Sequence, residues 1–179
     1  MKNCYQRSLT GLGSSKNYPD NLTIVDAILS QRSFKDFTKI YFKYCDGSGH
    51  QGTRSQPVPY KGTNLYFRGS NLTISKLNHL EQTLGLFSKS TEILVTGLSA
   101  GGLASFIWTD YIREKSASKN VYCAPDSGLF LDSANFHSKQ HEYRNMFVNL
   151  FKFSNVEINP PVPDCVNAFP NEPYMCMFA

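Results

Sequence analysis

The chain has 179 residues, of which 41% are hydrophobic and 18% are charged. This length and composition suit one globular domain with its own hydrophobic core. Eighteen basic and fourteen acidic residues give a formal net charge of +4, and the Lys and Arg are scattered along the chain. Scattered charge argues against a nucleic-acid-binding protein. No apolar run is long enough to span a bilayer, and the first residues lack the apolar core of a signal peptide.

The first half of the chain contains one predicted strand between two predicted helices. Residues 11–15 are expected to form a loop, and apolar residues then recur at helical spacing over 20–29. Residues 38–45 are rich in β-branched and aromatic types and alternate in polarity, which predicts a strand that ends at Asp46. Leucines and a phenylalanine at steps of three and four predict an amphipathic helix over 71–87.

The second half continues this alternation. An apolar run over 93–98 predicts a strand, and residues 103–112 present one apolar helical face after it. A further strand is predicted over 120–124, and a last helix places aromatic and aliphatic residues of 143–151 on one face. Strands that alternate with helices predict an α/β fold, with a mostly parallel sheet and helices on both faces.

A Gly-x-Ser-x-Gly pentapeptide stands where the second predicted strand meets its helix. It runs from Gly97 through Ser99 and Ala100 to Gly101. A serine hydroxyl is a weak nucleophile, so enzymes hold it in a sharp strand-to-helix turn where a base can reach it. We expect both glycines to be required because such an elbow crowds backbone against backbone. The context predicts a nucleophile elbow with Ser99 as the nucleophile.

Polar residues follow the carboxyl ends of all three predicted strands. Asp46 follows the first, Ser99 the second, and Asp126 the third. Functional groups in parallel sheets gather at these strand ends. We therefore expect the three segments to border one cleft.

Several motifs in a fixed order resemble the pectin acetylesterase family, whose wider clan includes the Notum carboxylesterases. The matching stretches are Leu12-Gly13-Ser14-Ser15, Tyr44-Cys45-Asp46-Gly47, Leu65-Tyr66-Phe67-Arg68-Gly69, Gly97-Leu98-Ser99-Ala100-Gly101-Gly102-Leu103-Ala104 and Asp126-Ser127-Gly128-Leu129-Phe130-Leu131-Asp132. The second and third of these stretches resemble the pectin acetylesterase branch more than the Notum branch.

The resemblance implies a secreted serine esterase of α/β-hydrolase type that needs no cofactor and acts on an acylated polysaccharide or another ester. It implies that Ser99 attacks the ester carbonyl and that the Ala100 amide donates into the oxyanion hole. The family's other oxyanion donors would precede Asn3, and its triad aspartate and histidine would follow Ala179. We therefore expect residues 1–179 to form a single, partial domain that is poorly soluble and inactive alone.

The remaining polar residues leave alternatives open. Asp126 is expected to bond loop amides or border the cleft, with triad acid as the other reading, and Asp46 is expected to fix a loop or meet a sugar hydroxyl. His137 and His141 lie four residues apart, which would place them on one helix face, where a surface or helix-end role is favoured over a metal pair or a base. His50 could border the cleft, and His79 is most simply a helix-face residue.

The cysteines and sequons bear on the cellular compartment. The five cysteines, Cys4, Cys45, Cys123, Cys165 and Cys176, include no metal-ligand spacing, so no metal site is expected. Two sequons begin at Asn21 and Asn71. If the complete protein is secreted, we expect Cys45 and Cys123 to be buried and at least one cysteine to pair outside these residues.

Two classes of function remain open. The first is an esterase of the pectin acetylesterase type, with a Notum-like protein deacylase as the variant. The second is a non-catalytic remnant, which folds in part or binds glycan without turnover. The elbow is common to both and does not identify the leaving alcohol.

Overall fold

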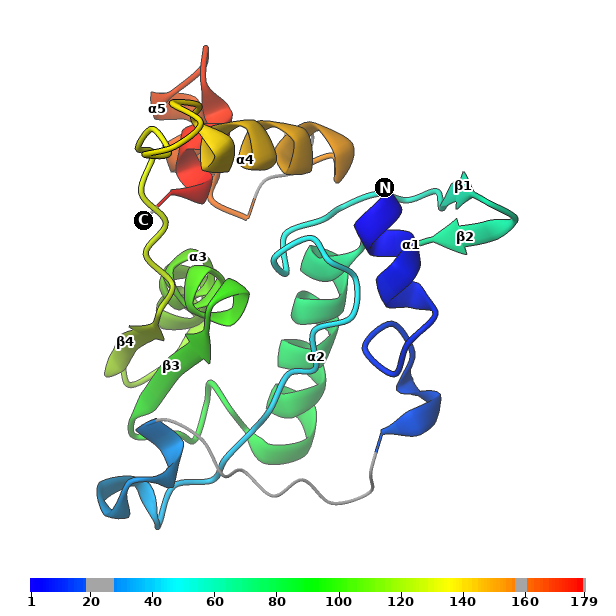
Figure 1. Cartoon of the computed structure of the whole chain (residues 1–179). Coiled ribbons are helices and arrows are strands. Elements are labelled where there is room, and N and C mark those ends of the chain that lie inside the picture. Colours follow the sequence, from blue (N-terminus) through cyan, green and yellow to red (C-terminus); the bar gives the residue numbers. More distant parts are fainter. Residues whose placement is uncertain (19–27, 157–160, 179) are drawn as a thin grey trace.

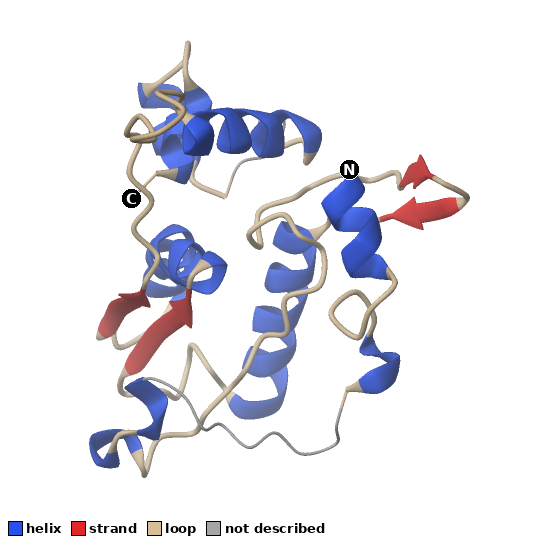
Figure 2. Ribbon diagram, in the orientation of Figure 1, coloured by secondary structure: helices blue, strands red, loops and turns tan. Residues whose placement is uncertain are grey.

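The computed structural model describes residues 1–18, 28–156 and 161–178. Its helices and strands form a mixed α/β arrangement, with the strands in two separate pairs (Figures 1 and 2). The helices are α1 (Lys2–Ser8), α2 (Gly69–Leu84), α3 (Ala100–Lys115), α4 (Glu142–Phe153) and α5 (Pro163–Ala168), and the strands are β1 (Val58–Tyr60), β2 (Thr63–Leu65), β3 (Ile93–Leu98) and β4 (Val121–Asp126). Short 3-10 turns are η1 (Ser15–Asn17), η2 (Ile28–Ser30), η3 (Arg32–Phe34) and η4 (Pro173–Met177).

Strands β3 and β4 form the predicted parallel pair. Ile93 lies opposite Val121, and Leu98 lies opposite Asp126. The connection between them is α3, which packs against both strands as a crossover helix should (Figure 1). The sequence pattern therefore located this β-α-β unit correctly.

The predicted strand over 38–45 is wrong for the described chain. These residues form an extended segment that pairs with no other strand among the described residues. In Figure 1 the segment runs between β3 and α2. A strand exists only through its ladder of hydrogen bonds to a neighbour, so β-prone residues are not sufficient.

An antiparallel hairpin, β1–β2, was not predicted. Lys61 and Gly62 form its two-residue turn, with φ of 48° and 75°. Positive φ at both turn positions is typical of the tight hairpin turn that matches strand twist. The Lys61-Gly62 pair was the local signal.

Helix α2 confirms the predicted amphipathic helix but ends before residue 87. Gly85 stops it with a φ of 71°. The Gly85 amide donates to the Glu81 carbonyl at 2.9 Å, and the Leu86 amide donates to the Leu80 carbonyl at 3.5 Å. The Glu81 carboxylate then accepts from the Phe87 amide at 2.6 Å. Most of the predicted helix over 20–29 lies outside the described residues. Its last two residues, 28 and 29, belong to the 3-10 turn η2.

One hydrophobic core joins α2, α3, β4 and α4. The apolar face predicted for 103–112 is buried at four of its positions, whereas Tyr111 is half-buried. On α4, Phe147 and Phe151 are buried, while Tyr143 and Met146 are 47% exposed. The core contains Leu77, Phe87, Leu103, Ala104, Ile107, Trp108, Ile112, Val121, Phe147, Phe151, Val156 and Met177.

The chain also has features that bear on its compartment. A disulfide joins Cys165 to Cys176 and links α5 to η4. Cys45 is half-buried and Cys123 is exposed, so neither has the expected burial in this chain. Among the described residues, the strand that carries Cys123 pairs only with β3. None of the described helices combines the length and apolar character needed to cross a membrane.

Candidate functional site

Ser99 occupies the sharp turn between β3 and α3. Its φ of 56° and ψ of −113° lie in a region that side-chain-bearing residues rarely adopt. The residue is exposed, and α3 begins directly after it at Ala100. This strained strand-turn-helix geometry is typical of a nucleophile elbow.

The two elbow glycines differ in what surrounds them. A Cβ on Gly97 would lie 2.5 Å from the carbonyl carbon and oxygen of Gly101, which no real contact allows. A Cβ on Gly101 would meet nothing within 4 Å. A side chain is therefore excluded at Gly97, as expected. At Gly101 the expectation is wrong, because an added Cβ would point into open space.

The end of β4 packs directly on the elbow. The Ser99 amide donates to the Asp126 carbonyl at 2.9 Å. A Cβ on Gly128 would lie 2.4 Å from the Gly102 backbone, and a Cβ on Gly102 would lie 2.6 Å from Gly128. This glycine-to-glycine contact was not predicted, although the Gly101-Gly102 pair was visible in the sequence.

Asp126 is half-buried, and its carboxylate accepts a hydrogen bond from the Ser127 hydroxyl at 3.0 Å. No histidine among the described residues bonds to it. Its backbone carbonyl, which holds the Ser99 amide, contacts the elbow. The Asp126 carboxylate thus bonds a loop hydroxyl rather than the expected loop amides, and it has no histidine partner of a triad acid among the described residues.

Asp46 organises the loop over residues 46–52. Its carboxylate accepts from both the amide and the hydroxyl of Ser48, and the Ser48 hydroxyl accepts from the Gly52 amide at 2.8 Å. A Cβ on Gly69, at the start of α2, would lie 2.8 Å from the Asp46 carboxylate. Asp46 therefore fixes a loop against α2, although it does not follow a strand as expected.

His50 links this loop to the helix that follows Ser99. Its ring stacks on Tyr44 with centroids 4.9 Å apart, and its carbonyl accepts from Trp108 Nε1 on α3 at 3.2 Å. Burial lowers the pKa of the His50 imidazole, and the nearby Lys76 ammonium lowers it further, against the opposing effect of Asp46. His50 is thus a buried residue whose ring stacks on Tyr44 and whose backbone carbonyl bonds to α3.

The loop over 46–52 and the elbow both contact the same helix, α3. A Cβ on Gly49 would lie 3.9 Å from Leu103, which is in the first turns of α3. With Gly128 against Gly102, both segments expected at the cleft contact the start of α3. The structure therefore gathers the three predicted segments around α3.

The other histidines lie elsewhere. His79 is exposed on α2, as expected. The expectation that His137 and His141 share a helix face is wrong, because α4 begins only at Glu142; His137 lies in a turn and His141 at the helix N-cap.

Asp132 anchors the segment after β4 to the start of α4. Its carboxylate bonds to His141 Nδ1 at 2.9 Å and to Arg144 Nε at 2.7 Å. The bond from Arg144, followed by the bond from His141, lowers the pKa of the Asp132 carboxyl. The sequence analysis included Asp132 only as the last residue of a family motif, and it did not single out Arg144.

The chemistry available at Ser99 is that of an exposed hydroxyl at a helix N-terminus. Amides in the first turn of a helix have no partner within the helix and favour negative charge nearby. In the part of the chain that the structure describes, no hydrogen bond joins the Ser99 hydroxyl to a histidine or a carboxylate. No cluster of at least three His, Cys, Asp or Glu residues able to hold a metal ion is present there either.

Comparison with known proteins agrees with the motifs. A family model described as "Pectinacetylesterase" matches residues 1–179. The chain is 34% identical over 139 residues to pectin acetylesterase 5 of Arabidopsis thaliana, which covers 74% of this chain and 31% of the relative. It is 29% identical over 137 residues to pectin acetylesterase 4 of the same plant, which covers 74% of this chain and 33% of that relative.

A more distant relative comes from an animal. The palmitoleoyl-protein carboxylesterase NOTUM of Schmidtea mediterranea is 28% identical over 105 residues, which is 56% of this chain and 19% of that protein. No solved structure matches. The chain thus spans about a third of the length of the plant relatives that it matches.

Proposed function

Since this chain belongs to the pectinacetylesterase family, we propose that it carries the nucleophile of a serine carboxylesterase that removes acetyl groups from a polysaccharide. The observation that supports this most is the conformation of Ser99, which is exposed at φ 56° and ψ −113° between β3 and α3. Backbone strain persists only where the surrounding structure enforces it, and it concentrates at functional sites.

In the proposed reaction the Ser99 hydroxyl oxygen attacks the ester carbonyl carbon and gives its proton to a base. The negative charge that develops on the carbonyl oxygen is stabilised by the Ala100 amide, at the positive end of α3. The alcohol then leaves with a proton, and water releases the acid from the acyl-enzyme.

The general base and its acid partner are assigned to further sequence of the kind that the longer relatives carry. Asp126 and Asp132 are occupied by Ser127 and by Arg144 and His141, respectively. In this proposal the complete protein has an α/β-hydrolase fold, in which further strands extend the β3–β4 pair into a larger sheet. The complete protein is also proposed to be secreted, which agrees with the Cys165–Cys176 disulfide.

Two observations favour a polysaccharide over an acylated protein as substrate. The plant pectin acetylesterases match 74% of the chain, whereas the planarian NOTUM protein matches 56%. The stretches Tyr44–Gly47 and Tyr66–Gly69 also resemble the pectin acetylesterase branch more than the Notum branch. A non-catalytic glycan-binding role is the alternative, because Ser99 has no base among the described residues.

The test compares ester hydrolysis by Ser99→Ala and by Ser133→Ala, a control at an exposed serine. In a full-length protein that contains this chain, we expect Ser99→Ala to reduce acetate release from acetylated pectin and from p-nitrophenyl acetate at least about a thousandfold. We expect Ser133→Ala to retain activity. The isolated 179-residue chain should be no faster than its own Ser99→Ala variant.

Each other result has a defined meaning. Undiminished turnover by a folded Ser99→Ala protein would remove Ser99 as the nucleophile. Release of an O-palmitoleoyl group from a serine peptide, without acetate release from pectin, would favour a protein deacylase. A folded full-length protein that hydrolyses neither ester would favour the non-catalytic role.

A further inference from the structure

The start of α2 carries a motif that the proposed function does not use. Asn71, Leu72 and Thr73 form an Asn-x-Thr sequon, which is the acceptor pattern for N-linked glycans. Such tripeptides often occur by chance, so the surroundings of the asparagine decide whether the folded chain has room for a glycan. The other sequon, at Asn21, lies outside the described residues.

Asn71 lies where a bulky group can be attached to the folded chain. It is exposed and belongs to the first turn of α2. Leu72 beside it is 44% exposed, and Ser75, one turn further along the helix on the same side, is exposed as well. Among the described residues, no hydrogen bond involves the Asn71 side chain. A sugar on Asn71 Nδ2 would therefore break no hydrogen bond of the described chain.

The third residue of the sequon, Thr73, is hidden by the fold. It is only 4% exposed, and its hydroxyl donates to the Gly69 carbonyl at 2.9 Å. The motif requires a hydroxyl at this position. Because α2 buries that hydroxyl, the folded chain does not present the whole motif at its surface. Transfer of a glycan to Asn71 must therefore precede the formation of α2.

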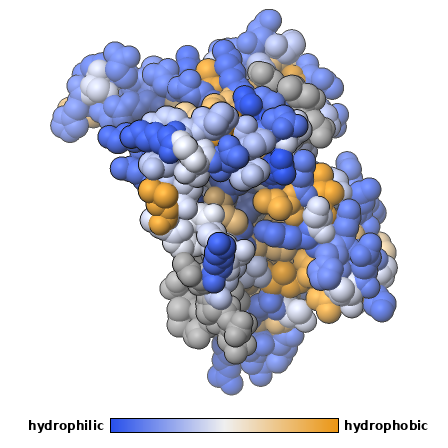
Figure 3. All heavy atoms as spheres, turned by 90° about the vertical axis from the view of Figure 1, so that its right-hand side faces the viewer, coloured by the Kyte–Doolittle hydropathy of each residue, from blue (hydrophilic) through white to orange (hydrophobic). Residues whose placement is uncertain are grey.

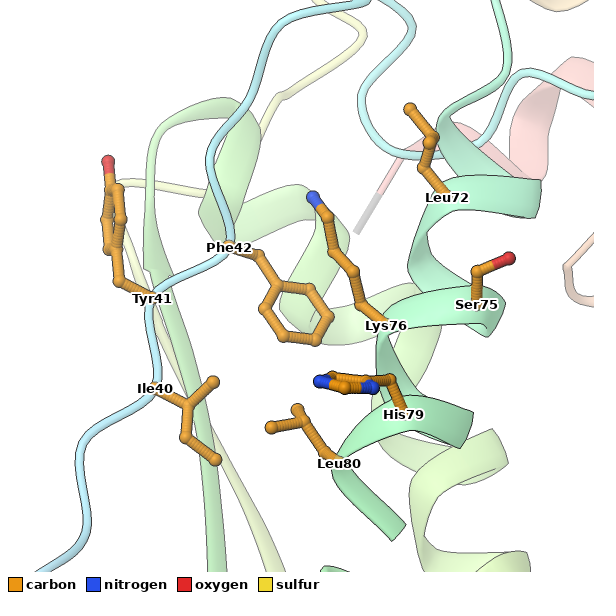
Figure 4. Close-up of a pocket in the computed structure, with 8 residues that line it drawn as sticks. All are labelled: Ile40, Tyr41, Phe42, Leu72, Ser75, Lys76, His79 and Leu80. Carbon is orange, nitrogen blue, oxygen red and sulfur yellow. The ribbon is translucent and has the colours of Figure 1, made fainter. Parts of the chain in front are cut away.

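Next to Asn71 lies apolar surface that a glycan would cover. An open groove with a cavity volume of about 400 Å³ separates the extended segment at residues 40–42 from α2, and Leu72 is part of its lining. Figure 4 shows Leu72 at the end of the groove nearest the start of α2. Glycans are bulky and solubilising. A glycan on Asn71 would therefore keep this exposed leucine away from other molecules.

We propose that Asn71 carries an N-linked glycan, which is added before α2 folds and shields Leu72. The inference rests on the secretion that the proposed function includes. In the transfer, Asn71 Nδ2 forms a bond to the anomeric carbon of an oligosaccharide that a lipid pyrophosphate carries. The bond from that carbon to the phosphate oxygen breaks, the lipid pyrophosphate leaves with the electron pair, and the amide gives one proton to a base of the transferase.

The first test measures whether Asn71 is modified. A full-length protein that contains this chain is expressed through a secretory pathway, and its peptides are mapped by mass after a glycosidase has converted each glycosylated asparagine to aspartate. We expect conversion at Asn71 in most molecules. Asn71→Gln should remove one glycan, whereas Asn78→Gln, at an exposed asparagine of α2 outside any sequon, should remove none. An unmodified Asn71 in the folded, secreted protein would overturn the proposal.

The second test measures when the glycan is added. A purified transferase and its lipid-linked donor are offered two acceptors: a peptide of residues 66–80, and the folded full-length protein made while donor synthesis is inhibited. We expect transfer to Asn71 to be at least about tenfold slower in the folded protein, because α2 must open before the Thr73 hydroxyl is accessible. The same peptide with Asn71→Gln should accept nothing. Equal rates for the two acceptors would overturn the proposed order of events.

The third test measures the shielding of Leu72 by light scattering. Removal of the glycan from the native protein should raise self-association several-fold, and Leu72→Ser should lessen that rise because less apolar surface is uncovered. An equal rise in the Leu72→Ser protein would overturn the shielding. Acetate release from pectin is measured on the same samples. Turnover without a glycan at Asn71 would remove only this inference, and a glycan without turnover would count only against the esterase.

Discussion

The backbone at Ser99 is held in its strained conformation by contacts on both sides. Its amide bonds to the Asp126 carbonyl at 2.9 Å, and its carbonyl accepts from the Leu103 amide at 3.0 Å. Gly97 allows β3 to pass against Gly101 at the same turn. The strain is thus supported by β4 and α3 together rather than by the pentapeptide alone.

The two elbow glycines give a matched pair of substitutions. We expect Gly97→Ala to destabilise the chain by about 1–3 kcal/mol, because its Cβ would collide with backbone that cannot move aside. Gly101→Ala should be neutral or stabilise by up to about 1 kcal/mol, because the position is helical and open. Urea unfolding of both variants beside the parent measures the difference. Equal destabilisation by the two changes would contradict the geometry.

At the scale of elements, the end of α4 depends on a segment far away in the sequence. The last carbonyls of a helix have no partner within it. Here the Thr53 amide donates to the Ser154 carbonyl at 3.0 Å, and Arg54 Nε donates to the Phe153 carbonyl at 2.8 Å. The Arg54 guanidinium also lies 5.5 Å from the Phe153 ring centroid. This joins α4 to the segment that follows the 46–52 loop.

Removal of the Arg54 side chain tests this connection. We expect Arg54→Ala to lower the free energy of unfolding by about 2 kcal/mol, from a lost charged hydrogen bond and a lost cation–π contact. The control is Arg113→Ala, whose exposed pair with Asp110 should contribute less than about 1 kcal/mol. Thermal or urea unfolding gives both values. A cost for Arg54→Ala no greater than that of the control would remove this role.

The same scale explains why one predicted strand is absent while another is present. Residues 38–45 and 93–98 are both rich in strand-forming types. The second has a partner, because α3 carries the chain back to place β4 beside it. The first has no ladder partner among the described residues. Local pattern identifies candidates, whereas pairing decides which of them become strands.

At the scale of the whole molecule, apolar side chains remain on the surface. Leu98 is 62% exposed, Leu129 and Leu131 are each 60% exposed, and Phe136 is 80% exposed. Figure 3 shows hydrophobic residues gathered in places on an otherwise hydrophilic face. Exposed apolar side chains promote association, so we still expect the isolated chain to be poorly soluble.

His50 should make the stability of the whole chain depend on pH. It joins the 46–52 loop, Tyr44 and α3, and burial lowers the pKa of its imidazole. The unfolded chain therefore binds the proton more tightly than the folded chain. The contribution of His50 to the free energy of unfolding is therefore fully present above the ordinary imidazole pKa of about 6.5. It is lost as the pH falls from there toward the lower pKa that His50 has in the folded chain.

The measurement is the midpoint of urea unfolding between about pH 5 and pH 8. We expect His50→Asn to lose part of the decline below about pH 6.5, since asparagine does not titrate and tolerates the left-handed backbone at φ 62°. The exposed His137→Asn should keep the full decline. A decline that is unchanged in His50→Asn would show that His50 does not cause it.

The sequence by itself determined the β3–α3–β4 unit, the position of Ser99 in its turn, and the helices α2 and α4. Each depends on a local periodicity or on a short motif, which residues a few positions apart specify. The family followed from several such motifs in order, and the comparisons confirm it. The sequence also contains local signals that led to no prediction, namely the Lys61-Gly62 pair at the β1–β2 turn and the Gly101-Gly102 pair.

Only the tertiary structure decided which residues surround Ser99. It brought Gly97 against the Gly101 backbone and Gly128 against Gly102, and it brought the His50 carbonyl to Trp108 of α3. It also used the Asp46 carboxylate to fix a loop and left residues 38–45 without a strand partner among the described residues. These outcomes depend on contacts between segments far apart in the chain, and no spacing within one segment encodes them.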